Sequence, residues 1–235
     1  MAATVDVIPE NTIRVLDHGF VRLDDAMASD LSVVNGARVS FARRKEVMDE
    51  SDEGLIRFLM RDRYGTPFEH NAFRFHIRCP IFVAREWMRH RVGSFNEFSM
   101  RYAKATDDFY VPAPEDVRTQ VGKPGAYSFE PVEPELAEQT REELRAVYDA
   151  AFAAYERLVD LGVARELARC VMPVGAYTEF YWTINARSLM NFVSLRAAET
   201  AQREIRRYAD ACEGFFAERM PVTHAAFVDA GRVAP

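Results

Sequence analysis

The chain has 235 residues, of which 49% are hydrophobic and 28% are charged, and these are ordinary values for a globular protein. They exclude intrinsic disorder, a collagen-like structure and a small disulfide scaffold as descriptions of the whole chain. The formal net charge of -6 argues against general binding of nucleic acid, because such binders are usually basic. The length fits a single domain over 1–235.

The cysteines Cys79, Cys170 and Cys212 lie far apart and form no CxxC pair. This pattern favours reduced thiols in a cytoplasmic protein and argues against a zinc ribbon or a disulfide framework. The first ten residues, MAATVDVIPE, lack the basic and apolar regions of a signal peptide. No apolar run reaches the ~18 residues of a membrane span, so we expect no contact with a membrane.

The first part of the chain is expected to form short strands and helices. Residues 12–23 predict two strands that turn at His18-Gly19. Helices are expected over 29–44 and 51–63, because apolar residues recur there at helical spacing.

Residues 72–78 give the clearest strand pattern, in which two sets of side chains alternate. The apolar set is Phe73, Phe75 and Ile77, and the polar set is Arg74, His76 and Arg78. Alternation places the two sets on opposite faces of the strand. Pro80 ends the strand and can begin a helix over 81–92.

The second part of the chain begins with five prolines within 112–134, which predict a long surface loop or insertion. A long helix over 134–161 should end at Gly162. The remaining expected elements are a helix over 163–171, an aromatic strand over 177–184, and helices over 187–196 and 199–219. Hairpin strands and long helices without regular βαβ alternation predict an α+β fold with an antiparallel sheet.

Residues 89–102, RHRVGSFNEFSMRY, place three arginines in a short stretch of an acidic chain. Arginine presents a planar fork that can bind phosphate through two parallel hydrogen bonds. If the end of the stretch is extended, Glu97, Ser99 and Arg101 share one face. Two other interpretations remain open at this point, a solvated basic turn and an RNA-binding patch, although the second normally requires a basic surface.

A second polar stretch covers 185–196, NARSLMNFVSLR. Arg187 and Asn191 are four residues apart and share a helix face. Arg196 is five residues beyond Asn191 and should point roughly 140° away from it. We therefore expect that one subunit cannot direct both side chains into one pocket. The alternative is an amphipathic helix with a solvated side.

Other chemistries find less support in the sequence. The histidines do not have metal-ligand spacing, and the motifs HExxH, GxSxG, GxGxxG and the Walker P-loop are absent. Glu69 and His70 are expected to pair with each other in the core. Ser99 has no evident base that would activate it as a nucleophile.

The stretch RHRVGSFNEFSMRY closely resembles the RHRxxSxNExSxRY signature of the flavin-dependent thymidylate synthases, also called ThyX. The resemblance continues in GTPFEHNAFRFHIRCPIFVAREWMRHR and in VARELARCVMPVGAYTEFYWTINARSLMNFVSLR, and together it covers most of 65–102 and 162–207. It implies that the protein makes dTMP from dUMP. The carbon would come from 5,10-methylenetetrahydrofolate, and the electrons from NADPH through non-covalent FAD. It also implies α+β subunits in a homotetramer with shared active sites.

The resemblance also implies roles for individual residues, and none of them is a metal ligand. Arg196 matches the catalytic arginine that activates the uracil ring. The matched FAD contacts are Thr66, Arg89, His90, Arg91, Glu97, Asn185, Arg187 and Asn191. The matched dUMP contacts are Glu86, Trp87, Met88, Arg89, Glu97, Phe98, Ser99, Met100, Arg101, Arg169 and Arg196.

This chain departs from the family pattern in a few places. Glu86 stands where many members have glutamine, which keeps an acceptor but removes an amide donor. Tyr64 stands where members often have histidine, and 198–203 differs from a frequent Asp-Ser-His…Trp pattern. The alternatives are a nucleotide-binding flavoprotein reductase that does not methylate and, outside enzymes, an RNA-binding module.

Overall fold

The computed structural model describes residues 9–235, so most of the N-terminal stretch examined for a signal peptide lies outside the described residues. Within them, five strands form one antiparallel sheet in the order β1-β2-β3-β7-β4. The α+β prediction is therefore confirmed. The strands are β1 (Thr12–Val15), β2 (Gly19–Met27), β3 (Ala72–Pro80), β4 (Ser94–Glu97) and β7 (Tyr177–Asn185).

The hairpin β1–β2 is confirmed, and Gly19 stands at the start of β2 because its neighbours leave no space for a side chain. A Cβ atom there would lie 1.9 Å from the Tyr208 hydroxyl oxygen. The alternation in β3 is also confirmed, since Phe73, Phe75 and Ile77 are fully buried. The polar set on the opposite face is exposed or only partly buried.

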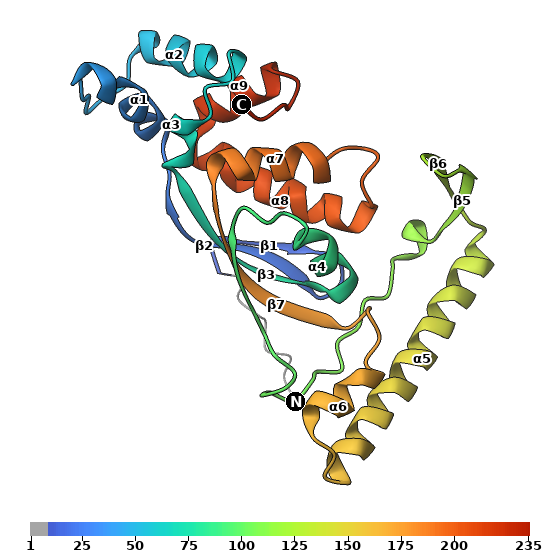
Figure 1. The fold of residues 1–235 in the computed structure, drawn as a ribbon. Helices are drawn as coiled ribbons and strands as arrows, with labels where there is room; N and C mark the ends of the chain where they lie inside the picture. The colour runs from blue at the N-terminus through green and yellow to red at the C-terminus, as the bar shows by residue number, and fades with distance from the viewer. Residues whose placement is uncertain (1–8) are drawn as a thin grey trace.

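Three helices pack against the sheet, namely α4 (Ile81–Trp87), α7 (Ala186–Arg196) and α8 (Arg203–Arg219) (Figure 1). An aromatic cluster joins them to β7. Trp87 stacks on Phe192 with ring centroids 4.8 Å apart, and Trp182 packs edge-on to Phe192 at 4.9 Å. Aromatic pairs at such distances add to the stability that burial provides, so this cluster fixes where α4 and α7 lie.

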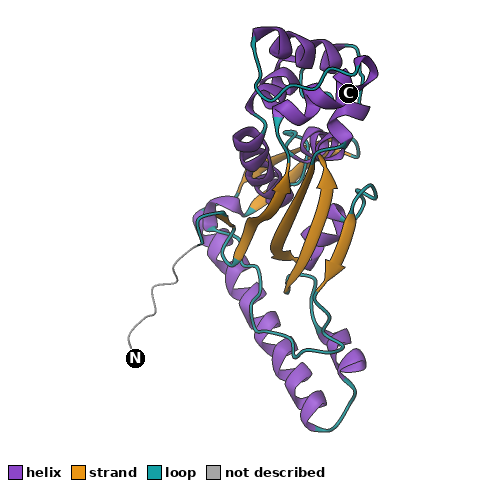
Figure 2. Ribbon diagram, turned by 90° about the vertical axis from the view of Figure 1, so that its left-hand side faces the viewer, coloured by secondary structure: helices purple, strands orange, loops and turns teal. Residues whose placement is uncertain are grey.

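A second group of helices forms the upper end of the molecule (Figures 1 and 2). Its members are α1 (Asp30–Arg38), α2 (Glu50–Arg61), α3 (Thr66–Glu69) and α9 (Pro221–Asp229). The expected helix over 29–44 is too long, because Ala42 adopts a left-handed backbone (φ 52°) after a 3₁₀ turn over Val39–Phe41. Helix α9, a short helix that begins at Pro221 directly after α8, was not expected from the sequence.

The lower end contains the long helix α5 (Pro134–Asp160) and the short helix α6 (Arg165–Ala168) (Figure 2). The end of the long helix is as expected, because Gly162 has a positive φ of 84°. The segment 112–134 contains a hairpin of β5 (Arg118–Lys123) and β6 (Ala126–Pro131), and every residue of β6 is exposed. The ion pair of Arg118 with buried Glu204 ties the base of this hairpin to α8.

The last expected helices differ only at their ends. The element expected over 163–171 is α6 followed by a 3₁₀ turn over Arg169–Val171. The last long helix begins at Arg203 instead of 199. Among residues 9–235, no helix is long and apolar enough to cross a membrane.

Candidate active site

A cavity of about 670 Å³ lies where α7 faces the segment that follows α4. It brings together residues that are about 100 positions apart in the chain. From the two polar stretches of the sequence it is lined by Arg89, His90, Arg91, Asn185, Arg187, Asn191 and Arg196. The cavity therefore holds four arginines in a chain whose net charge is -6, which suits an anionic ligand.

Asn191 and Arg196 both line this cavity, so the expectation that one subunit cannot direct both into one pocket is wrong. The angle of 140° describes only the direction in which each side chain leaves the helix. Arginine has a long side chain, and that of Arg196 reaches His90, 106 positions away in the chain. Reach along the side chain offsets the angular separation around the helix.

Arg196 is held by three hydrogen bonds. Its Nε donates to His90 Nε2 at 3.0 Å, Nη1 donates to a carboxylate oxygen of Glu86 at 3.2 Å, and Nη2 donates to the main-chain oxygen of Glu86 at 3.2 Å. Because Nε2 of His90 accepts, the proton of the neutral ring is on Nδ1. Burial and the nearby Arg196 charge lower the pKa of His90 to about 4, so this ring is neutral near pH 7.

Arg187 is held at the other side of the cavity. Its Nε donates to the main-chain oxygen of Pro235 at 2.6 Å, and its Nη1 donates to Glu69 at 2.7 Å. The side chain also lies across Gly65, where a Cβ would stand 2.4 Å from Nε. The expected pair between Glu69 and His70 is therefore wrong, because the Glu69 carboxylate meets Arg187, and His70 is exposed.

Arg89 and Arg91 are exposed, and within residues 9–235 no carboxylate forms an ion pair with either guanidinium. Asn185 caps α7 by accepting a hydrogen bond from the Ser188 main-chain nitrogen at 2.8 Å. Thr66, at the start of α3, is exposed beside Gly65. These side chains keep polar groups available to a ligand.

The remaining predicted contacts gather beyond the end of β4. Phe98 is exposed, and residues 99–102 form a turn in which the Tyr102 main-chain nitrogen donates to Ser99 O at 3.0 Å. The expected extended arrangement of Glu97, Ser99 and Arg101 on one face is therefore wrong. Sequence alternation could not reveal where β4 ends, because its end depends on pairing with β7. That pairing stops at Glu97 of β4.

The side chains at this end make few contacts with distant parts of the chain. Arg101 lies over the ring of its neighbour Tyr102, and Arg169 donates from Nε to Glu166 O at 3.3 Å. Glu97 accepts from the Thr178 hydroxyl at 2.8 Å. Met100 packs near α6 in a small apolar cluster.

Two groups of predicted residues therefore lie at opposite ends of β7. Arg169 precedes the strand, and Arg187 follows it. Nine residues at about 3.3 Å per step span about 26 Å, which exceeds the length of a mononucleotide. One subunit does not bring Arg169 and Arg187 together around one small ligand.

Two predicted contacts, Trp87 and Met88, belong largely to the core. The Trp87 side chain is fully buried against Phe192, and Met88 is partly buried against the same cluster. Conversely, Ala234 and Pro235 line the cavity, although no sequence motif marks them. These two residues follow α9, and the packing of α9 brings them to the cavity. The sequence alone does not reveal that packing.

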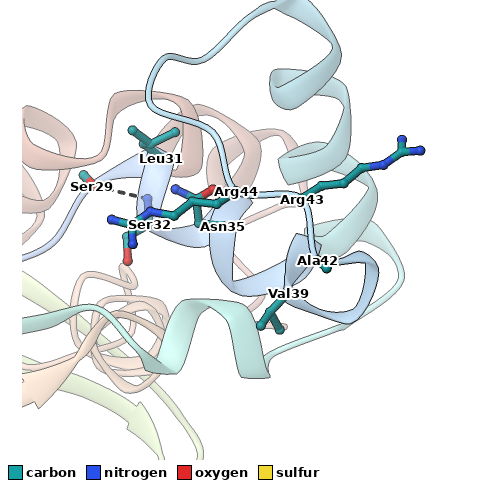
Figure 3. Close-up of a pocket in the computed structure, with 8 residues that line it drawn as sticks. All are labelled: Ser29, Leu31, Ser32, Asn35, Val39, Ala42, Arg43 and Arg44. Atoms are coloured by element: carbon teal, nitrogen blue, oxygen red, sulfur yellow. Dashed lines mark hydrogen bonds between the residues drawn. The ribbon is translucent and has the colours of Figure 1, made fainter.

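A different cavity of about 640 Å³ lies beside α1, lined in part by Ser29, Ser32, Asn35, Arg43 and Arg44. Figure 3 shows Arg44 extending toward Ser32, whereas Arg43 points away into solvent. None of the site residues predicted from the sequence lines it. The cavity beside α7 is therefore the better candidate for the active site.

Comparison with known proteins identifies the family of this chain. Residues 22–222 match the family model of the thymidylate synthase complementing protein. The flavin-dependent thymidylate synthase of Thermosipho melanesiensis is 45% identical over 92% of this chain and 93% of its own length. That of Tropheryma whipplei is 44% identical over 97% and 96%.

Solved structures give the same result. The crystal structure of the UMP/dUMP methylase PolB from Streptomyces cacaoi, bound with 5-Br dUMP, matches with a TM-score of 0.87 and 45% identity, over 95% of this chain and 100% of that one. The same protein bound with 5-Br UMP also matches with a TM-score of 0.87. This chain belongs to the thymidylate synthase complementing protein family, the family of the flavin-dependent thymidylate synthases.

Proposed function

We propose that this chain converts dUMP to dTMP, with 5,10-methylenetetrahydrofolate as the carbon donor and NADPH as the source of electrons through FAD. The observation that carries the proposal is the single cavity in which Arg89, Arg91, Arg187 and Arg196 meet. The substrates and the flavin are all anions, so clustered arginines in an acidic chain fit this reaction.

The cavity suits a flavin in the chemistry of its donors. Unpaired arginine forks can bind the diphosphate, and the amides of Asn185 and Asn191 can donate to ring oxygens or sugar hydroxyls. Six of the matched residues line this cavity and would hold non-covalent FAD, namely Arg89, His90, Arg91, Asn185, Arg187 and Asn191. Thr66 and Glu97 do not line it, and Glu97, which lies toward the other end of β7, would reach the flavin from another subunit. When bound, FAD supplies hydride transfer, and the protein supplies orientation and electrostatics.

Arg196 is the proposed catalytic residue. Three of the five N–H groups of its guanidinium are used by Glu86 and His90, so two remain for a ligand. Negative charge develops on the imide side of the uracil ring when C6 receives hydride. A fixed donor of this kind stabilises such charge, as an oxyanion hole does.

Contacts to dUMP are proposed from the other end of β7, at Ser99, Arg101 and Arg169. Arg169 precedes β7, whose nine residues span about 26 Å, and Ser99 lies beyond Glu97, which pairs with Phe180. Because the arginine cavity is at the Asn185 end of the strand, we propose that each site combines the two ends from different subunits of a homotetramer. Symmetry-related copies can bring such surfaces together.

Subunit mixing tests the shared site. Arg196→Ala and Arg169→Ala subunits, each inactive alone, should restore some active sites after exchange, because one chain supplies each missing residue. Arg196→Ala mixed with Asn191→Ala is the matched control and should not recover, since both residues line the same cavity. Equal recovery in both mixtures, or none in either despite verified exchange, would contradict the shared arrangement.

The reaction itself is tested by omitting each component in turn. Purified protein should be yellow. After its flavin has been removed, it should form dTMP only when dUMP, methylenetetrahydrofolate, NADPH and FAD are all supplied. Release of tritium from 5-tritiated dUMP should accompany dTMP. NADPH oxidation without dTMP would favour the flavoprotein reductase, and colourless protein that binds RNA would favour the RNA-binding module.

A second substrate has support from the comparisons. The solved neighbour from Streptomyces cacaoi is a UMP/dUMP methylase and is as similar to this chain as the thymidylate synthases are, with 45% identity in each case. UMP should therefore be assayed beside dUMP at equal concentration. A kcat/KM for UMP within about tenfold of that for dUMP, a difference of ~1.4 kcal/mol, would mean that this chain methylates both nucleotides.

A further inference from the structure

Glu86 lies in the last turn of α4 and bonds to Arg196. It contacts Arg196 twice, through a carboxylate oxygen and through its main-chain oxygen, both at 3.2 Å. Arg196 and His90 line the cavity, whereas Glu86 does not. The ion pair is partly shielded from solvent, with side-chain exposures of 23% for Arg196 and 29% for Glu86.

We propose that Glu86 acts on the reaction through Arg196, as an anionic positioning residue, and not by contacting dUMP itself. The inference rests on the catalytic role proposed for Arg196. Within residues 9–235, Glu86 provides the only carboxylate that pairs with this guanidinium.

The geometry gives Glu86 and His90 separate tasks. His90 accepts from Nε at 3.0 Å and is neutral near pH 7, so it orients the guanidinium without offsetting its charge. Glu86 orients Nη1 and Nη2 and also supplies the negative charge. Together they fix the plane of Arg196 and leave two N–H groups free, which is the preorganisation that a developing charge requires.

The charge of Glu86 makes this arrangement sensitive to pH. Two charged groups act on it, namely Arg196 from α7 and Glu204 from α8, and His90 is linked to it through Arg196. Burial raises the pKa of Glu86 above its usual 4.5, Glu204 adds to the rise, and Arg196 opposes it. As the pH falls through this raised pKa, the carboxylate takes up a proton and Arg196 loses its charged partner.

Two substitutions separate positioning from charge. Glu86→Ala removes the carboxylate acceptor and keeps the main-chain one, and it should lower kcat for dTMP formation by about tenfold, the effect of one hydrogen bond to a charged group. Glu86→Gln keeps an acceptor oxygen and should recover kcat at pH 8 to within about threefold of the original chain. Because the amide does not titrate, the loss of kcat between pH 7 and pH 5 should be smaller in Glu86→Gln.

The affinity for FAD should stay within about twofold in both variants, because Glu86 does not line the cavity. Glu138→Gln is the matched control, since Glu138 also pairs with arginines but lies on α5, away from the site. The inference would be overturned if Glu86→Ala had the kcat of the original chain. It would also be overturned if kcat fell equally between pH 7 and pH 5 in Glu86→Gln and in the original chain.

A measurement on the ligand-free protein distinguishes this inference from the proposed function. Carboxyl ¹³C NMR identifies the Glu86 signal by its loss in Glu86→Gln. The Glu86 pKa should be above 4.5 and should rise further in Arg196→Gln, because the opposing positive charge is gone. An unchanged Glu86 pKa in Arg196→Gln would refute the pairing. If the pKa does change but the original chain forms no dTMP, the proposed function fails while the pairing stands.

Discussion

The two ends of β7 carry the same kinds of side chain but hold them in different ways. At the end that leads into α7, Arg196 bonds to Glu86, 110 positions away, and Arg187 bonds to Glu69, 118 positions away. At the other end, Arg169 bonds to a residue three positions away, and Arg101 to its direct neighbour. One subunit therefore holds Arg187 and Arg196 at the first end through distant partners, whereas Arg101 and Arg169 at the second end bond to residues close in sequence.

The largest expected effect tests the first end. Arg196→Lys keeps the positive charge but loses the planar fork that meets Glu86 and His90. We expect dTMP formation to fall by about 10²–10³-fold, or ~2.7–4 kcal/mol, the loss of one oxyanion donor. Steady-state kinetics measures this fall, and reduction of FAD by NADPH without dUMP should change little. Equal loss of both half-reactions would contradict the role of Arg196.

The next effect concerns binding of the flavin and the choice between two cavities. Arg91→Ala removes an unpaired guanidinium from the cavity beside α7, and FAD affinity should fall by roughly 10–100-fold, as for a hydrogen bond to a charged group. Arg44→Ala is the matched control in the cavity beside α1 and should not weaken binding. Titration followed by flavin fluorescence measures both, and the reverse order of effects would place the flavin beside α1.

A smaller effect should follow from displacing Arg187. In Gly65→Ala, the new Cβ would stand 2.4 Å from Nε of Arg187, so this flexible side chain must leave Glu69 and Pro235. We expect FAD affinity to fall by about tenfold. Gly54→Ala on α2 is the control, because no atom lies within 4 Å of its new Cβ.

In the Gly54→Ala control, helix propensity should raise the free energy of unfolding by about 0.5–1 kcal/mol, with FAD affinity unchanged. Calorimetry and flavin titration on both variants distinguish the two effects. Full FAD affinity in Gly65→Ala would show that the position of Arg187 does not matter for the flavin.

The smallest effect is expected at the second end of β7. Ser99→Ala removes a hydroxyl that accepts only a local hydrogen bond, from the Arg101 main-chain nitrogen at 3.3 Å. We expect dUMP affinity to fall by about threefold with turnover retained, because no base is placed to make Ser99 a nucleophile. Binding titrations and single-turnover kinetics test this. A trapped covalent bond between Ser99 and uracil C6 would refute it.

Local patterns predicted much of the fold. The alternation in β3, the hairpin at Gly19 and the stop of α5 at Gly162 all follow from residues that are close in sequence, and the structure confirms them. The hairpin within 112–134 and the helix α9 were missed. Both are short, and neither has a hydrophobic repeat long enough to reveal its type.

The sequence by itself determined the α+β class and indicated which two stretches carry the site, because alternation, caps and arginine density are properties of neighbouring residues. Only the tertiary structure decided that Asn191 and Arg196 share a cavity, that Glu86 holds Arg196, and that Pro235 holds Arg187. It also decided that Ser99 and Arg101 lie in a turn. The physical reason is that these outcomes depend on side-chain reach and on pairing between segments about 50 to 110 positions apart, which no local pattern encodes.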